Sequence, residues 1–208
     1  MPATTAADPR CYAHAPPERQ RAALQRLVAG NDDLMAVLTR LRGSGLPDAW
    51  LVSGAIYGSV WNALTGRPPR HGIKDYDLIY FDASDLSWEA EDRQIRRLEA
   101  LMAPLGLPVE LRNQARVHLW YPERFGGDYP RLSEATQSLS FYAARTHSIA
   151  VRLDGDDIAV AAPFGLGLIF DLRIVPNPLM DNRATYREKG ARALRHWPEL
   201  IVEPWPDD

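Results

Sequence analysis

The stretch "GIKDYDLIYFD", residues 72–82, contains an apolar run that begins with two acidic residues. Its alternation predicts a β-strand over residues 75–81. Residues two apart in a strand point to the same face, so Asp75 and Asp77 share a face with Ile79 and Phe81, and the other face carries Tyr76, Leu78 and Tyr80. Both faces are apolar beyond residue 77, which predicts a strand covered on both sides with two carboxylates at the edge of the core.

Two neighbouring carboxylates at such an edge repel each other and are poorly solvated. The pair is tolerated if one carboxyl takes up a proton, if a basic residue such as Lys74 or an arginine compensates, or if a cation lies between them. Mg²⁺ accepts a few carboxylates and completes its shell with water and substrate phosphates. The apolar "LIYF" after the pair excludes an EF-hand loop, and a phosphatase-type aspartate would follow its strand. A glycosyltransferase, which holds a nucleoside diphosphate sugar through a metal, stays open.

The upstream stretch "LVSGAIYGSVWN", residues 51–62, predicts a strand, a tight turn and a helix that ends near Gly66. Glycine allows a close backbone approach to a phosphate, and a helix N-terminus favours an anion. Ser53, Gly54, Ser59 and Lys74 are therefore candidate nucleotide contacts, although each also has a purely structural interpretation. Downstream, "PVELRNQ" (residues 108–114) predicts a half-buried strand that carries a third acid, Glu110.

The chain is similar to a bacterial family of predicted nucleotidyltransferases within the polymerase-β-like superfamily. The similarity covers roughly residues 20–200, and the stretches that carry it are "VWN" (60–62), "DYDLIYFD" (75–82), "ELRNQARVHLWY" (110–121), "PFGL" (163–166) and "PNP" (176–178). The resemblance implies the polymerase-β-like fold, a metal pair at Asp75 and Asp77, and Glu110 as the third ligand. It also implies Mg²⁺ or Mn²⁺ and a nucleoside triphosphate. The Gly-Gly or Gly-Ser of the superfamily appears here as Gly54-Ala55 or as Gly58-Ser59.

Composition limits the class of protein. The 208 residues include 24 basic and 27 acidic side chains, a net charge of −3, and a single cysteine, Cys11. No disulfide, signal peptide or membrane span is expected, so we predict a cytoplasmic protein. A mildly acidic chain is poorly suited to gripping a nucleic acid, which favours a small molecule or a protein as acceptor. Lysine is rare, since Lys74 and Lys189 are the only two.

Residues 1–16 are expected to be a flexible lead-in. Residues 17–208 are expected to form a single α/β (α+β) domain, a small mixed sheet flanked by helices, with a C-terminal helical elaboration. The pattern predicts helices over residues 18–30, 32–43, 56–66, 88–102 and 183–197. "SLSFYAARTHSIAVRL" (138–153) predicts a helix and then a strand from Ser148, and Asp154-Gly155 predicts a hairpin turn.

For several residues the sequence does not decide between a role in a functional site and a structural role. Alternation would place Gln114, Arg116 and His118 on one side of an extended segment, where they either line a cleft or bond to neighbouring loops. Asp171, Asp156 and Asp157 are rival third ligands. The arginine-rich helix at 183–197 is read as a packed helix with a solvated face. The scattered histidines do not suit zinc.

We therefore expect a Mg²⁺-dependent nucleotidyltransferase that uses Asp75, Asp77 and Glu110. A non-catalytic nucleotide-binding or partner-binding module on the same fold is the alternative.

Overall fold

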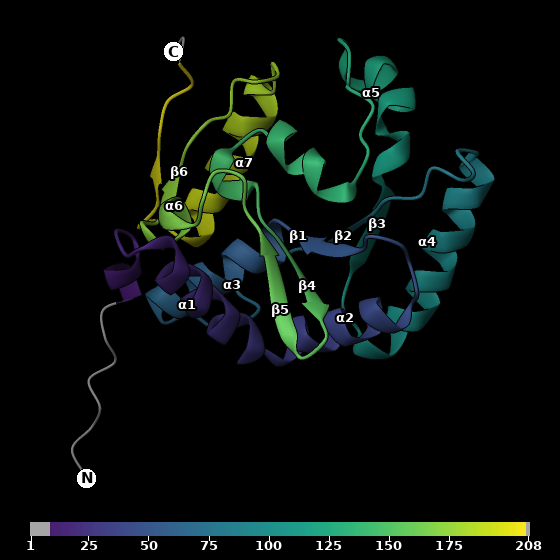
Figure 1. Ribbon diagram of the computed structural model, residues 1–208. Helices are drawn as coiled ribbons and strands as arrows, with labels where there is room; N and C mark the ends of the chain where they lie inside the picture. The colour runs from purple at the N-terminus through teal and green to yellow at the C-terminus, as the bar shows by residue number, and fades with distance from the viewer. Residues whose placement is uncertain (1–8, 207–208) are drawn as a thin grey trace.

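A five-stranded mixed sheet with the order β3-β2-β1-β4-β5 forms the centre of the computed structural model, which describes residues 9–206 (Figure 1). β2 and β3 run parallel, and the other neighbours are antiparallel. The strands are β1 (Trp50–Val52), β2 (Tyr76–Tyr80), β3 (Val109–Asn113), β4 (Ala150–Asp154) and β5 (Asp157–Ala161), with a separate parallel pair, β6 (Arg173–Ile174) and β7 (Ile201–Val202). The mixed α/β architecture predicted from the sequence is confirmed.

Helices cover both faces of the sheet. They are α1 (Pro17–Ala29), α2 (Asp32–Gly43), α3 (Gly54–Thr65), α4 (Trp88–Met102), α5 (Val117–Phe125), α6 (Gly167–Phe170) and α7 (Arg183–His196). Short 3₁₀ segments join them: η1 (Pro9–Tyr12), η2 (Ala103–Leu105), η3 (Gln114–Arg116), η4 (Ala135–Phe141) and η5 (Arg145–His147). Figure 1 shows α1, α2 and α3 on one side of the sheet and α5 and α7 on the other. Among residues 9–206, no helix combines the length and apolar character needed to cross a bilayer.

The strand that contains Asp77 is buried on both faces, as its composition predicts. Leu78 and Tyr80 pack into the main core with Leu51, while Ile79 packs into a second cluster with Val52. The free energy gained by burying these side chains fixes the register, because a slip of one residue would exchange the two faces. The same constraint holds Asp77 on the face of Ile79.

The pairing of β1, β2 and β3 aligns the functional candidates. Val52 is the register partner of Asp77 on one side, and Glu110 is its partner on the other. Because α4 provides the crossover between β2 and β3, the two strands run parallel and their acids lie side by side. The sequence predicted both strands, and the three acids were expected to converge from neighbouring extended segments, but the parallel register was not predicted.

Asn62, from the "VWN" stretch, fixes the proline-containing loop after α3. Its buried amide Nδ2 donates to the carbonyl oxygens of Pro69 and His71, each at 2.9 Å. Its Oδ1 accepts a 2.8 Å hydrogen bond from Trp197 Nε1. All three contacts satisfy buried polar groups, so this residue has a structural role.

We expect Gly72→Ala to destabilise the protein by about 1–3 kcal/mol, because the new methyl would overpack the core. Gly72 has φ +68°, and a Cβ there would lie 2.6 Å from Trp197 Cη2 and 3.0 Å from His196 Cβ. Gly66→Ala is the matched control, since Gly66 has φ +66° with open space around it. Urea unfolding of both variants separates the steric clash from the backbone strain that they share. Equal losses of stability would contradict the clash.

Two predictions about local structure are wrong. Tyr12 and Ala13 of the expected flexible lead-in are packed: Gln20 Nε2 donates 3.0 Å hydrogen bonds to their carbonyls, and the Tyr12 ring lies 5.5 Å from that of Phe170. Residues 1–8 lie outside the described part of the chain.

The helix expected within residues 138–147 forms two 3₁₀ segments separated by extended backbone. Asn177, from the "PNP" turn, explains the interruption. Its Nδ2 donates to the carbonyls of Ser140 and Tyr142 at 2.8 and 2.9 Å, and Ala144 pairs with Pro176 in a β-bridge. These long-range bonds satisfy the backbone in place of a continuous helix.

Candidate active site

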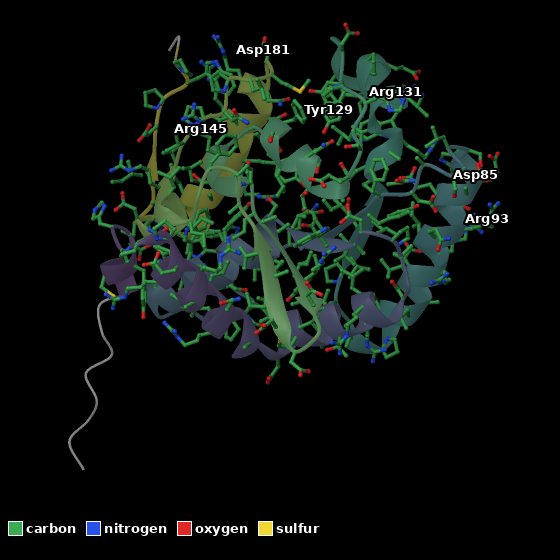
Figure 2. All side chains as sticks on the ribbon, in the orientation of Figure 1. Asp85, Arg93, Tyr129, Arg131, Arg145 and Asp181 are labelled. Carbon is green, nitrogen blue, oxygen red and sulfur yellow. The ribbon has the colours of Figure 1, made fainter. Side chains whose placement is uncertain are left out.

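A cavity of about 280 Å³, here called the main cavity, lies on the Asp77 face of the sheet. Acidic and polar side chains form one part of it, and an aromatic wall from α5, η4 and the intervening loop forms the rest. Figure 2 shows Tyr129, one wall residue, in the region between α5 and α7. The polar lining includes Ser53, Asp77, Glu110, Gln114, His147 and Lys189, and the aromatic lining is Trp120, Tyr121, Phe125, Tyr129, Phe141 and Tyr142.

Asp77 is half-buried at the edge of the main cavity. Its pKa is raised to about 6, first by burial, then by the charge of Asp75 and, to a smaller extent, by that of Glu110. The cations of Lys189 and Lys74 oppose these effects but do not cancel them. A carboxylate in this position gains from an additional positive charge.

Asp75 lies two residues before Asp77 and lines a small adjoining pocket with Gly54, Lys74 and Lys189. Lys74 Nζ donates a 2.9 Å hydrogen bond to Asp75 Oδ2, which raises the lysine pKa. The Lys74 side chain is exposed, so this ion pair is weak and can be exchanged. Lys189 lines both the adjoining pocket and the main cavity.

Glu110 lies directly across from Asp77, and half of its side-chain surface is accessible. Its Oε2 is 3.8 Å from Arg112 Nη2, a long contact between two exposed side chains. Such a pair leaves the Glu110 carboxylate free to turn toward Asp77.

Within residues 9–206, no three acidic, histidine or cysteine side chains already converge as a cation site. The donor set nevertheless fits a hard divalent cation. Asp77 and Glu110 are register partners on adjacent strands, and Asp75 directly precedes β2. Burial and the charge of Asp75 raise the pKa of Asp77, so a cation beside it would stabilise its charged form. Two of the three carboxylates, on Asp75 and Glu110, are held only by exposed partners.

The turn between β1 and α3 brings a helix N-terminus to the same place. Ser53 adopts φ +58° and ψ −115°, an unusual conformation for a residue other than glycine. Its N–H donates to the Ile149 carbonyl at 2.9 Å, and its carbonyl accepts from the amides of Ile56 and Tyr57. The first amides of a helix lack intrahelical partners, so the N–H groups of Gly54 and Ala55 are suited to an anion.

Ser59 is not brought to this site. Its hydroxyl donates to the Ala55 carbonyl at 2.7 Å and accepts from Asn31 Nδ2 at 3.2 Å. It lines a different cavity, together with Arg26, Arg67 and Arg70.

The segment predicted to alternate through Gln114, Arg116 and His118 is helical, so that prediction is wrong and the three side chains diverge. Gln114 lines the main cavity. Arg116 is buried and forms an ion pair with Glu91, and its Nε donates to the Leu86 carbonyl. His118 Nε2 lies 3.1 Å from Arg131 Nε. The stretch "ELRNQARVHLWY" therefore contains a residue that lines the cavity as well as residues with structural roles.

The rival third ligands lie elsewhere. Asp171 pairs with Arg173 at 3.1 Å, and Asp156 and Asp157 belong to the β4–β5 hairpin. Sequence reasoning missed Lys189 and His147, which line the main cavity. The scarcity of lysine was a usable signal, because Lys74 and Lys189 both border the aspartates.

Comparison with known proteins agrees with the geometry. A family model described as nucleotidyltransferase matches residues 39–202. A solved structure described as "The NMR structure of the protein reveals a CCA-adding enzyme head domain" is similar with a TM-score of 0.74 and 24% identity, over 88% of this chain and 96% of that one. No curated protein matches significantly. The structural similarity shows a polymerase-β-like nucleotidyltransferase fold.

Proposed function

This chain belongs to the nucleotidyltransferase family, and from that premise we propose that it moves a nucleoside monophosphate from a nucleoside triphosphate to an acceptor hydroxyl, with Mg²⁺ or Mn²⁺. One observation carries the proposal: Asp77 lies opposite Glu110 on adjacent strands, in a cavity that also has an aromatic wall.

Asp75, Asp77 and Glu110 would hold the cations, with Asp75 released from Lys74 and Glu110 turned away from Arg112. When bound, the cations lower the pKa of the acceptor hydroxyl and offset charge on the leaving group. The acceptor oxygen bonds to the α-phosphorus as the α–β anhydride bond breaks, pyrophosphate leaves, and the hydroxyl proton passes to water. Such transfer depends chiefly on positioning and electrostatics, so no nucleophilic side chain is required.

The remaining walls suit the other parts of a nucleotide. Ser53 and Gly54 place the N-terminus of α3 where a phosphate can accept backbone N–H bonds. Lys74 lines the adjoining pocket with Gly54 and would add positive charge there once Asp75 turns away. The aromatic wall offers ring faces on which a base or a planar acceptor can stack.

We propose a small molecule or a protein side chain as the acceptor, in the cytoplasm. The net charge of −3 gives no general attraction to a polyanion. The similar solved structure is described as part of a CCA-adding enzyme, so an RNA acceptor is the outcome to test against. Tight RNA binding that weakens steeply with salt would contradict this part of the proposal.

The test is transfer of label from α-³²P nucleoside triphosphates to components of a cell extract. We expect labelled product with Mg²⁺, none after EDTA treatment, and recovery when Mg²⁺ or Mn²⁺ is restored. If the triphosphate binds but no label moves under any metal condition, the passive nucleotide-binding module is favoured. Greater thermal stabilisation by nucleoside diphosphate sugars than by triphosphates would favour glycosyl transfer.

A further inference from the structure

A polar corner, formed by Lys189 and Arg192 of α7 with His147 of η5, lies beside the N-terminus of α3. Lys189 lines both the main cavity and the adjoining pocket, and Arg192 lines the adjoining pocket with Gly54. Residues three apart on a helix share a face, so both cations face the same region.

The two cations of the corner are not held in place by an ion pair with any residue from 9 to 206, although Lys189 acts electrostatically on Asp77 and Asp75. In the part of the chain that the structure describes, neither Lys189 nor Arg192 forms a side-chain hydrogen bond or an ion pair. Lys189 is accessible to solvent and Arg192 is half-buried. By contrast, Arg67 and Arg70 each bind a carboxylate, Glu199 and Asp33. Cations that border a cavity and form no ion pair with the protein are available to an anionic ligand.

His147 supplies the independent observation. It is only 2% exposed, it lines the main cavity with Lys189, and its Nε2 is buried without a hydrogen-bond partner. Its ring stacks on Tyr57 with the centroids 4.6 Å apart, which fixes the ring plane. Burial, together with Lys189 and Arg192, holds the pKa of His147 well below its usual value, so the imidazole is neutral. A buried polar atom without a partner is costly, and a ligand that bonds to it removes that cost.

The strand order places this corner on one side of the acids. Across the sheet run Glu110 on β3, Asp77 on β2, Ser53 after β1 and His147 before β4. The corner therefore lies on the α3 side of Asp77, and Glu110 lies on the other side.

We infer that Lys189, Arg192 and His147 hold the β- and γ-phosphates of the triphosphate at the N-terminus of α3. This inference rests on the proposed function and deepens it, because it assigns the phosphate end of the substrate to α7. Lys189 and Arg192 balance the phosphate charge, and His147 hydrogen-bonds to a phosphate oxygen through a neutral N–H.

Calorimetry with inorganic tripolyphosphate in the presence of Mg²⁺ tests the inference on the full chain. Lys189→Gln and Arg192→Gln should each weaken binding by about tenfold or more, as expected for loss of a charge-assisted contact. Arg195→Gln is the matched control, because Arg195 is on the same helix but lines neither the main cavity nor the adjoining pocket. It should bind tripolyphosphate as the wild type does.

His147→Gln should weaken tripolyphosphate binding several-fold in a variant whose melting temperature shows that it is folded. If that variant does not fold, the tripolyphosphate affinities of Lys189→Gln and Arg192→Gln test the inference by themselves. Unchanged affinity for tripolyphosphate in both cation variants overturns the inference. A Lys189→Gln variant whose only change is tighter Mg²⁺ binding also overturns it, because Lys189 would then be a simple counter-charge to the acids. These outcomes are separate from the proposed function, since label transfer by the wild type would still occur. Loss of tripolyphosphate binding in the variants would support the corner even if no label moved.

Discussion

Asp77→Asn is expected to reduce nucleotide transfer by at least about 100-fold, the scale observed when one preorganised electrostatic group is removed from an active site. The amide has nearly the same shape but cannot supply the negative charge that would hold a divalent cation between Asp77 and Glu110. The measurement is the rate of label transfer from α-³²P triphosphate at saturating Mg²⁺. Calorimetry should show the same loss in binding of the Mg²⁺-nucleotide.

The same substitution should make the metal-free protein more stable, by roughly 1–2 kcal/mol at pH 7.5. The pKa of Asp77 is raised to about 6 from an ordinary value of 3.8, so above pH 6 the folded state carries a charge that is more costly than in the unfolded chain. The gain should disappear as the pH falls toward 3.8, where the carboxyl takes up a proton in both states. Urea unfolding at several pH values checks this sign.

Asp157→Asn is the control, because Asp157 is an exposed aspartate of the β4–β5 hairpin. It should change neither transfer nor stability appreciably. Full activity in Asp77→Asn would remove the basis for the cation site. Loss of activity together with loss of stability would indicate a structural role for Asp77.

Glu91→Ala is expected to lower the free energy of unfolding by about 3–5 kcal/mol, because it leaves a buried guanidinium unpaired. Glu91 Oε2 binds Arg116 Nη1, and Glu91 Oε1 accepts a 2.8 Å hydrogen bond from the Asn113 amide. Both side chains of the pair are nearly inaccessible, at 8% for Glu91 and 10% for Arg116. These bonds join α4 to the end of β3 and to η3. Urea denaturation monitored by circular dichroism measures the change.

Glu99→Ala, on an exposed position of the same helix, should alter stability by less than about 0.5 kcal/mol. The double variant Glu91→Leu/Arg116→Met should be less damaged than Glu91→Ala, because no buried charge is left without a partner. A loss below about 1 kcal/mol in Glu91→Ala would show that solvent compensates Arg116. The ion pair would then not hold η3 in place.

The sequence by itself determined the elements and the face of Asp77. Alternation in residues 75–81 predicted the strand, and the apolar pattern predicted α1, α2, α3, α4 and α7, because periodicity reports which side of an element is buried. The prediction that a doubly covered strand begins with Asp75 and Asp77 followed from the same local pattern.

Composition and motif did not separate site residues from structural ones. The stretch "NQARVHLWY" contains Gln114, which lines the main cavity, and Arg116, which forms an ion pair with Glu91 of α4. The distinction depends on the partner that each side chain finds. Partners distant in sequence leave no trace in local periodicity.

Only the tertiary structure decided that Glu110 lies across from Asp77, and that α7 brings Lys189 to the main cavity and both Lys189 and Arg192 to the adjoining pocket. Strand pairing and helix docking are set by the total burial and hydrogen bonding of the folded chain, which no single segment encodes. The lead-in and the interrupted 138–147 segment illustrate the same cause. Hydrogen bonds from Gln20 and Asn177 there override what the local sequence favours.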